Sequence, residues 1–137
     1  FLNKNKDLKE NSNLIKVGAL LIHAAKIDQD YSNEEELIIT EMLIKIGADS
    51  QNISNIIQKS KEMEENSNQI LEFTKEVKNM SEENKIMIIE TLWRIIFSNK
   101  KADIYETNLM RRLAGLLYID NKIMGDIKYK IEKENSK

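Results

Sequence analysis

The sequence predicts an all-α fold, a single compact bundle of about seven helices. It contains no proline and only four glycines among 137 residues, so helix breakers are scarce. Apolar residues recur every three or four positions, which is the period of a helix with one buried face. Short segments rich in Asn, Asp and Ser separate these stretches. The length and the 41% hydrophobic content suit one domain with one core.

The first predicted core helix runs from Leu14 to Ile27, with Ser12 available as its N-terminal cap. Residues 1–12 are polar and show little periodicity, so we expect a tail or a frayed leading turn there. Residues 13–137 are then expected to form the helical domain. Because the chain begins with Phe1 rather than Met, the sequence leaves an upstream signal or domain open.

A capping box marks the start of the second helix. Ser32 is followed three residues later by Glu35, and in this motif each side chain accepts a hydrogen bond from a backbone N–H of the other residue. We therefore predict a helix over residues 33–46, ended by Gly47. Asp49 or Ser50 is expected to cap a third helix.

The third helix is expected to run through Ser60, and the polar stretch at 61–69 reads as a solvated helix end or joint. A weaker amphipathic helix follows over residues 71–79.

The helix that opens at Ser81 is apolar on more than one face through Phe97, so it is the best candidate for a buried central helix. Trp93 lies four residues before Phe97, which is ordinary core spacing.

Two further helices complete the prediction. Asp103 and Glu106 repeat the capping-box spacing ahead of an apolar stripe over residues 109–117. Asp120 can start a last helix over residues 123–131.

The two halves of the chain match at a fixed offset of 71 residues. Helix-start positions and core positions both agree without a gap, which apolar periodicity alone does not explain. The matched pairs are Ser32 with Asp103, Glu35 with Glu106, Asp49 with Asp120, Val17 with Ile88, Leu21 with Leu92, Ile39 with Met110, Met42 with Leu113, Ile46 with Leu117 and Ile56 with Ile127. We therefore expect an internal pseudo-two-fold repeat, with halves at about 14–60 and 85–131, packed as one globule.

Charge and composition exclude several classes of function. With 21 basic and 23 acidic residues the net charge is −2, so the chain has no field that would collect nucleic acid or anionic lipid. The absence of cysteine removes disulfides, thiolate zinc sites and cysteine nucleophiles, and it fits a reducing compartment, so we expect a cytoplasmic protein. No apolar stretch reaches the roughly 20 residues of a membrane span.

The segment from Asp28 to Glu36 is the densest cluster of oxygen donors in the chain, and Ca²⁺ and Mg²⁺ prefer such ligands. Its spacing begins like that of a calcium-binding EF-hand loop. Asn33 stands where that loop needs Gly, however, and Ile39 stands where it needs a bidentate Glu, so an EF-hand is excluded. The alternative is structural, since the same carboxylates complement the positive end of a helix. We expect these acidic groups to lie in solvated helix starts, without the perturbation that acid–base catalysis needs.

No motif favours an enzyme. The chain lacks a glycine-rich phosphate loop and a nucleophile elbow. His23, the single histidine, has no cysteine partner for a zinc site, and a core or interface role is expected for it. We therefore expect a module that binds rather than catalyses.

Two segments resemble the tellurite-resistance TerB family and its TerB-like relatives. They read HAAKIDQDYSNEEELII and LWRIIFSNKKADIYETNLMRRLAGLL, and the similarity covers about Leu14 to Ile127. The resemblance implies a compact bundle of about seven helices with an internal pseudo-repeat.

The TerB resemblance also implies a site for a divalent metal. The family pattern is an Asp-Gly pair with a Glu seven residues after the Asp, once per half. Asp28 and Glu35 match it in the first half, and Gln29 replaces the Gly, whereas only Glu106 matches in the second. Asp30 lies in the same segment, residues 28–36, which we call the acidic loop. The expected ligands of a divalent cation (Ca, Mg, Mn or Zn) are therefore Asp28, Asp30, Glu35 and Glu106.

The second half is expected to bind a cation more weakly than the first. Asn99 and Lys100 stand where the family pattern has Asp and Gly, and Lys101 adds a second positive charge beside them. For function, the resemblance implies a bacterial stress-response domain that acts through a protein partner. The alternative is a structural, co-chaperone-type interaction module without metal.

Overall fold

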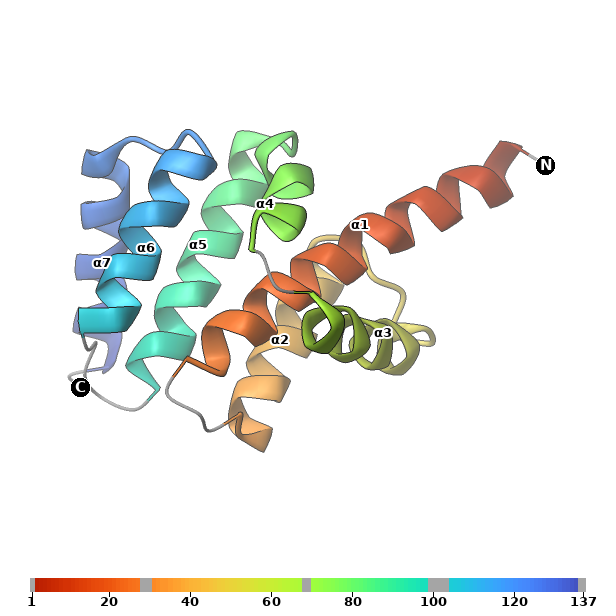
Figure 1. Cartoon of the computed structure of the whole chain (residues 1–137), viewed down its shortest axis with the longest axis horizontal. Coiled ribbons are helices and arrows are strands. Elements are labelled where there is room, and N and C mark those ends of the chain that lie inside the picture. Colours follow the sequence, from red (N-terminus) through yellow and green to blue (C-terminus); the bar gives the residue numbers. More distant parts are fainter. Residues whose placement is uncertain (1, 28–30, 68–69, 99–103, 136–137) are drawn as a thin grey trace.

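A computed structural model describes residues 2–27, 31–67, 70–98 and 104–135 (Figure 1). The described residues form an all-α bundle of seven helices, which confirms the predicted fold class. The helices are α1 (Leu2–Ala25), α2 (Asn33–Lys45), α3 (Ile53–Asn66), α4 (Leu71–Lys78), α5 (Glu82–Phe97), α6 (Ile104–Leu116) and α7 (Asn121–Asn135).

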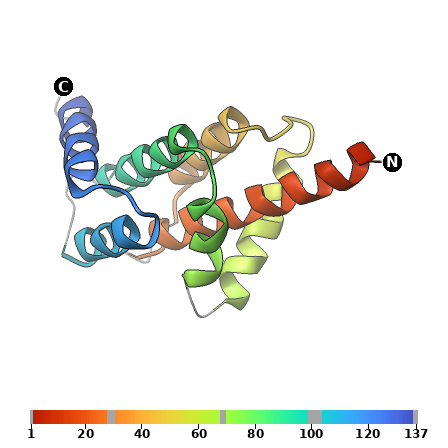
Figure 2. The same cartoon turned by 90° about the horizontal axis from the view of Figure 1, so that it is seen from above.

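The first helix is longer than the sequence pattern predicts. It begins at Leu2, so the expected tail is helical and Ser12 lies inside α1 instead of capping it. The leading segment contains Lys, Glu and Leu but no Gly or Pro, and it extends a helix that the core already holds in place. Figures 1 and 2 both show this part of α1 extending beyond the other helices.

Two helices carry most of the core. The C-terminal half of α1 packs against α2, α3, α4 and α5, and Val17, Leu20 and Leu21 are fully buried there. Helix α5 packs against α1, α2 and α7 and is buried on more than one face, as predicted. Helices α5, α6 and α7 lie on the side of the molecule away from the N-terminus (Figure 2).

The crossing of α1 and α3 depends on two small residues. The side chain of Ser60 on α3 is fully buried, and its single hydroxyl hydrogen is shared between two carbonyl acceptors, Ile15 on α1 at 3.0 Å and Ile56 on α3 at 2.8 Å. A Cβ atom added to Gly18 would overlap with this side chain. Gly18 therefore lets the two helices approach closely, and the Ser60 hydroxyl links them.

Side-chain contacts join α5 to α7. Glu90 on α5 pairs with Lys130 at 3.6 Å, and Arg94 pairs with Glu134 at 3.6 Å. On α5 itself, Trp93 and Phe97 are buried and stacked with ring centroids 5.7 Å apart, so the predicted core role of both rings is confirmed.

The cap of the third helix differs from the prediction. Helix α3 begins after Asn52, whose side chain forms no capping hydrogen bond. Asp49 instead accepts a hydrogen bond from the N–H of Gln51 at 3.0 Å and stabilises the turn before the helix. Helix α3 also continues to Asn66, past the expected joint at 61, because residues 61–65 are Lys, Glu and Met, which are all good helix formers.

Replacing Gly18 by alanine is expected to destabilise the protein. The added methyl group forces α1 and α3 apart in a close-packed region, and overpacking of this kind costs about 1–3 kcal/mol. Because the nearest atoms belong to Ser60, the double variant Gly18→Ala/Ser60→Ala should lose less free energy of unfolding than the two single variants together. Urea denaturation of the four proteins measures this coupling.

Gly115→Ala is the matched control. Gly115 lies on α6 with no atom within 4 Å of an added Cβ, so alanine there should raise stability by about 0.5–1 kcal/mol. Equal effects of the Gly18 and Gly115 substitutions would contradict the close approach of α1 to α3.

Candidate functional site

The predicted capping box forms at the start of α2. The Ser32 hydroxyl accepts a hydrogen bond from the N–H of Glu35 at 3.1 Å, and the Glu35 carboxylate accepts one from the N–H of Ser32 at 2.8 Å. Two backbone donors at the helix start are thereby satisfied. Asp103, which is expected to form the corresponding capping box in the second half, lies outside the described residues.

Glu35 and Glu106 are buried, which corrects the expectation of solvated helix starts. Their side chains are only 2% and 5% exposed. Each is the third residue of its helix, Glu35 on α2 and Glu106 on α6. The first turns of both helices lie toward the same side of the molecule as the C-terminal ends of α1 and α5 (Figure 1). The fold therefore brings one buried carboxylate from each half to this side.

Glu36 is bound by residues that the sequence pattern did not identify. Its carboxylate forms an ion pair with Lys61 on α3 at 2.6 Å and accepts a hydrogen bond from the Tyr31 hydroxyl at 3.3 Å. Burial of Tyr31, together with the nearby Glu36 carboxylate, raises the pKa of its phenol above the ordinary value, so the phenol remains a donor. Part of the acidic character of this segment is thus neutralised within the fold.

The structure describes two of the four expected metal ligands. It places Glu35 and Glu106, while Asp28 and Asp30 fall outside the described residues. Within the described residues, no group of three or more His, Cys, Asp or Glu side chains is arranged to hold a metal ion. Glu34, the other carboxylate next to Glu35, is exposed. His23 is half-buried on α1.

Because Glu35 is a buried capping residue, its loss should destabilise the protein more than the loss of its neighbour Glu34. Glu35→Ala removes both the capping acceptor and a buried side chain, so we expect a loss of about 2 kcal/mol in the free energy of unfolding. Glu34→Ala, at an exposed position in the same turn, should change it by less than about 0.5 kcal/mol.

Chemical denaturation at neutral pH compares the two alanine variants. Equal losses would show that Glu35 is no more than a surface charge at the helix start.

Comparisons with known proteins identify the family of this chain. No helix in the described ranges combines the length and the apolar character needed to cross a membrane. No curated protein and no solved structure matches the chain. The family model of the tellurite resistance protein TerB matches residues 14–128. That match covers most of the chain and includes α2, α5, α6 and both buried glutamates. The chain therefore belongs to the TerB family.

Proposed function

We propose that this TerB domain is a stress-response module, related to tellurite resistance, that binds a divalent cation through Asp28, Asp30 and Glu35 and acts by contacting a protein partner. The supporting observation is that Glu35 and Glu106 are buried at the same position of their helices. In this proposal Glu106 is the ligand that the second half contributes.

The same proposal treats the domain as an internal pseudo-two-fold repeat. Supporting it, the turns after α2 and α6 share backbone geometry at positions 71 residues apart. Gly47 and Tyr118 both have positive φ angles, of 125° and 57°. Three hydrogen bonds of the first turn each have a counterpart in the second. The bond from Ile46 N to Met42 O corresponds to that from Leu117 N to Leu113 O, and the bond from Ala48 N to Leu43 O corresponds to that from Ile119 N to Ala114 O. The bond from Gln51 N to Asp49 Oδ1 corresponds to that from Lys122 N to Asp120 Oδ1.

The chemistry of the donors favours a hard cation. All four proposed ligands are carboxylates, which suit Ca²⁺, Mg²⁺ and Mn²⁺ better than Zn²⁺. A bound cation would neutralise the acidic loop and fix it against the start of α2. Lys100 and Lys101 oppose a cation beside Glu106, so the first half should contribute most of the affinity.

Exposed apolar and aromatic side chains support the protein-contact part of the proposal. Leu37 and Ile44 lie on one face of α2 and are 59% and 41% exposed. Tyr105, Tyr118 and Tyr129, on or next to α6 and α7, are 62% exposed or more. Tyrosine is enriched at protein interfaces because its ring supplies contact area and its hydroxyl supplies a hydrogen bond.

A structural, co-chaperone-type interaction module without metal is the second candidate. It is favoured by the complete capping box, in which Glu35 already serves the backbone of Ser32, and by the pairing of Glu36 with Lys61. In that case the carboxylates stabilise helix starts, and their loss changes stability without changing partner binding.

Calorimetric titration of the metal-stripped protein with Ca²⁺, Mg²⁺, Mn²⁺ and Zn²⁺ separates the two candidates. The proposal predicts binding tighter than about 1 mM for at least one of the hard cations. Asp28→Asn should weaken that binding by about tenfold or more, and Glu106→Gln should weaken it less. Asp126→Asn, an exposed carboxamide substitution on α7, is the matched control and should leave affinity unchanged.

Two results would contradict metal binding. One is an absence of heat with all four cations at millimolar concentration. The other is an equal loss of affinity in the Asp28 and Asp126 variants, which would indicate loose attraction to overall negative charge.

A further inference from the structure

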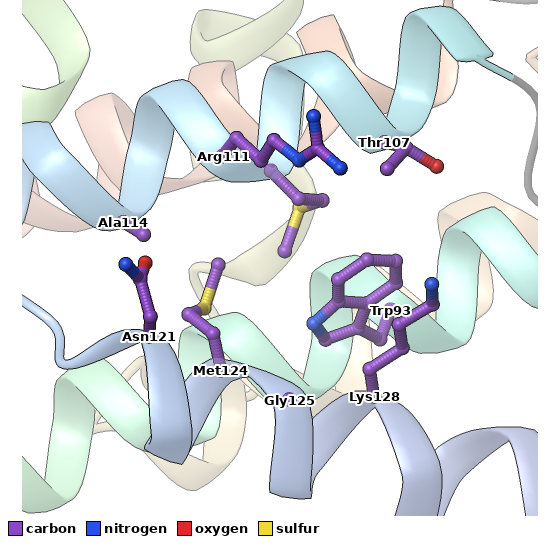
Figure 3. Close-up of a pocket in the computed structure, with 9 residues that line it drawn as sticks. Trp93, Thr107, Arg111, Ala114, Asn121, Met124, Gly125 and Lys128 are labelled. Carbon is purple, nitrogen blue, oxygen red and sulfur yellow. The ribbon is translucent and has the colours of Figure 1, made fainter.

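A pocket of about 240 Å³ lies between α5, α6 and α7 (Figure 3). Trp93 contributes its indole from α5, Met110 and Arg111 come from α6, and Met124 and Lys128 come from α7. These residues are far apart in the sequence, so no motif identifies the pocket. Only the packing of three helices brings them together.

The pocket contains a buried hydrogen-bond donor without an acceptor. Trp93 is 3% exposed, and its Nε1–H has no hydrogen-bond partner within the described part of the chain. A buried donor left unpaired costs about 1–3 kcal/mol, and most such groups in folded proteins are satisfied. Figure 3 shows the nitrogen edge of the indole on the side where Met124 lies. An acceptor entering the pocket would therefore gain a donor that the protein leaves unused.

The charges around the pocket favour an anion. Among the residues that the structure describes, Arg111 and Lys128 are the charged groups that line it, and no Asp or Glu does. Neither cation forms an ion pair with a described residue, and the Lys128 ammonium lies 5.6 Å from the centre of the Trp93 ring. Arginine binds a carboxylate through two parallel hydrogen bonds, so Arg111 can act as the anchor.

The walls of the pocket favour a small apolar body. Met110, Met124 and Ala114 line it beside the indole, and at Gly125 an added Cβ would meet no atom within 4 Å. The volume is below the roughly 300–1,000 Å³ of sites for drug-sized ligands, so the ligand is about one ring in size. Methionine side chains adapt their shape, so the two methionines can uncover the indole N–H when a ligand enters.

We propose that this pocket binds a small aromatic carboxylate. The carboxylate pairs with Arg111 in the field of Lys128 and accepts a hydrogen bond from Trp93 Nε1, while its ring lies against the methionines. This inference does not rest on the proposed cation site, because the pocket shares no residue with the acidic loop.

Phenylacetate is the probe for the test. The chain has one tryptophan, so the intact protein gives a single indole N–H signal in a ¹H–¹⁵N spectrum. We expect phenylacetate to move that signal to lower field in a saturable way, with a Kd of about 1 mM or tighter. Acetate and benzyl alcohol, which lack the ring and the charge respectively, should bind at least about tenfold more weakly.

Matched variants locate the binding. Arg111→Gln should weaken phenylacetate binding by about fivefold or more, whereas Arg112→Gln, at the exposed neighbouring position outside the pocket, should leave it unchanged. Gly125→Leu should fill the pocket and abolish the shift, while Gly115→Leu, an exposed glycine on α6 outside the pocket, should not. The other amide signals show whether each variant remains folded.

Three outcomes would overturn the proposal. They are an indole signal that does not shift, a shift of equal affinity with acetate or benzyl alcohol, and a shift that survives both Arg111→Gln and Gly125→Leu in folded protein.

Discussion

The close contact between α1 and α3 at Gly18 and Ser60 is the constraint on which the rest of the structure depends. A residue without a side chain meets a fully buried serine, whose hydroxyl bonds to a backbone carbonyl of α1. This contact fixes α1 among α2, α3, α4 and α5. Helix α2, which carries Glu35, packs directly against α1, so the position of Glu35 depends on the packing of the core.

Helices α2 and α6 share local structure, but the charges near them in the sequence differ. A glutamate is buried at the third position of α2 and of α6, and each of these helices ends in a turn with a positive φ angle. The first half has further carboxylates next to its glutamate in the sequence, whereas the second half has Lys100 and Lys101 at the corresponding sequence positions. The second half instead forms a pocket with a positive rim, at Arg111 and Lys128. The proposed organic anion therefore binds within the second half, whereas the proposed cation takes most of its ligands from the first half and Glu106 from the second.

Local signals in the sequence predicted much of this structure. The spacing of Ser32 and Glu35 predicted the start of α2, because a capping box is complete within four residues. The sequence pattern could not predict that Glu35 and Glu106 are buried, or that Lys61 pairs with Glu36, because both depend on how helices pack. The pocket at Trp93 was missed for the same reason, since core spacing predicts a buried indole but not an unpaired N–H.

The packing of α1 is tested most directly by native-state hydrogen exchange. If α1 is the element on which the bundle is built, the amides of residues 17–22 should exchange only through global unfolding, with the free energy that denaturation gives for the whole domain. Amides of α6, which borders the pocket, should exchange through smaller openings. Exchange of residues 17–22 at free energies well below the global value, or before α6, would contradict the account.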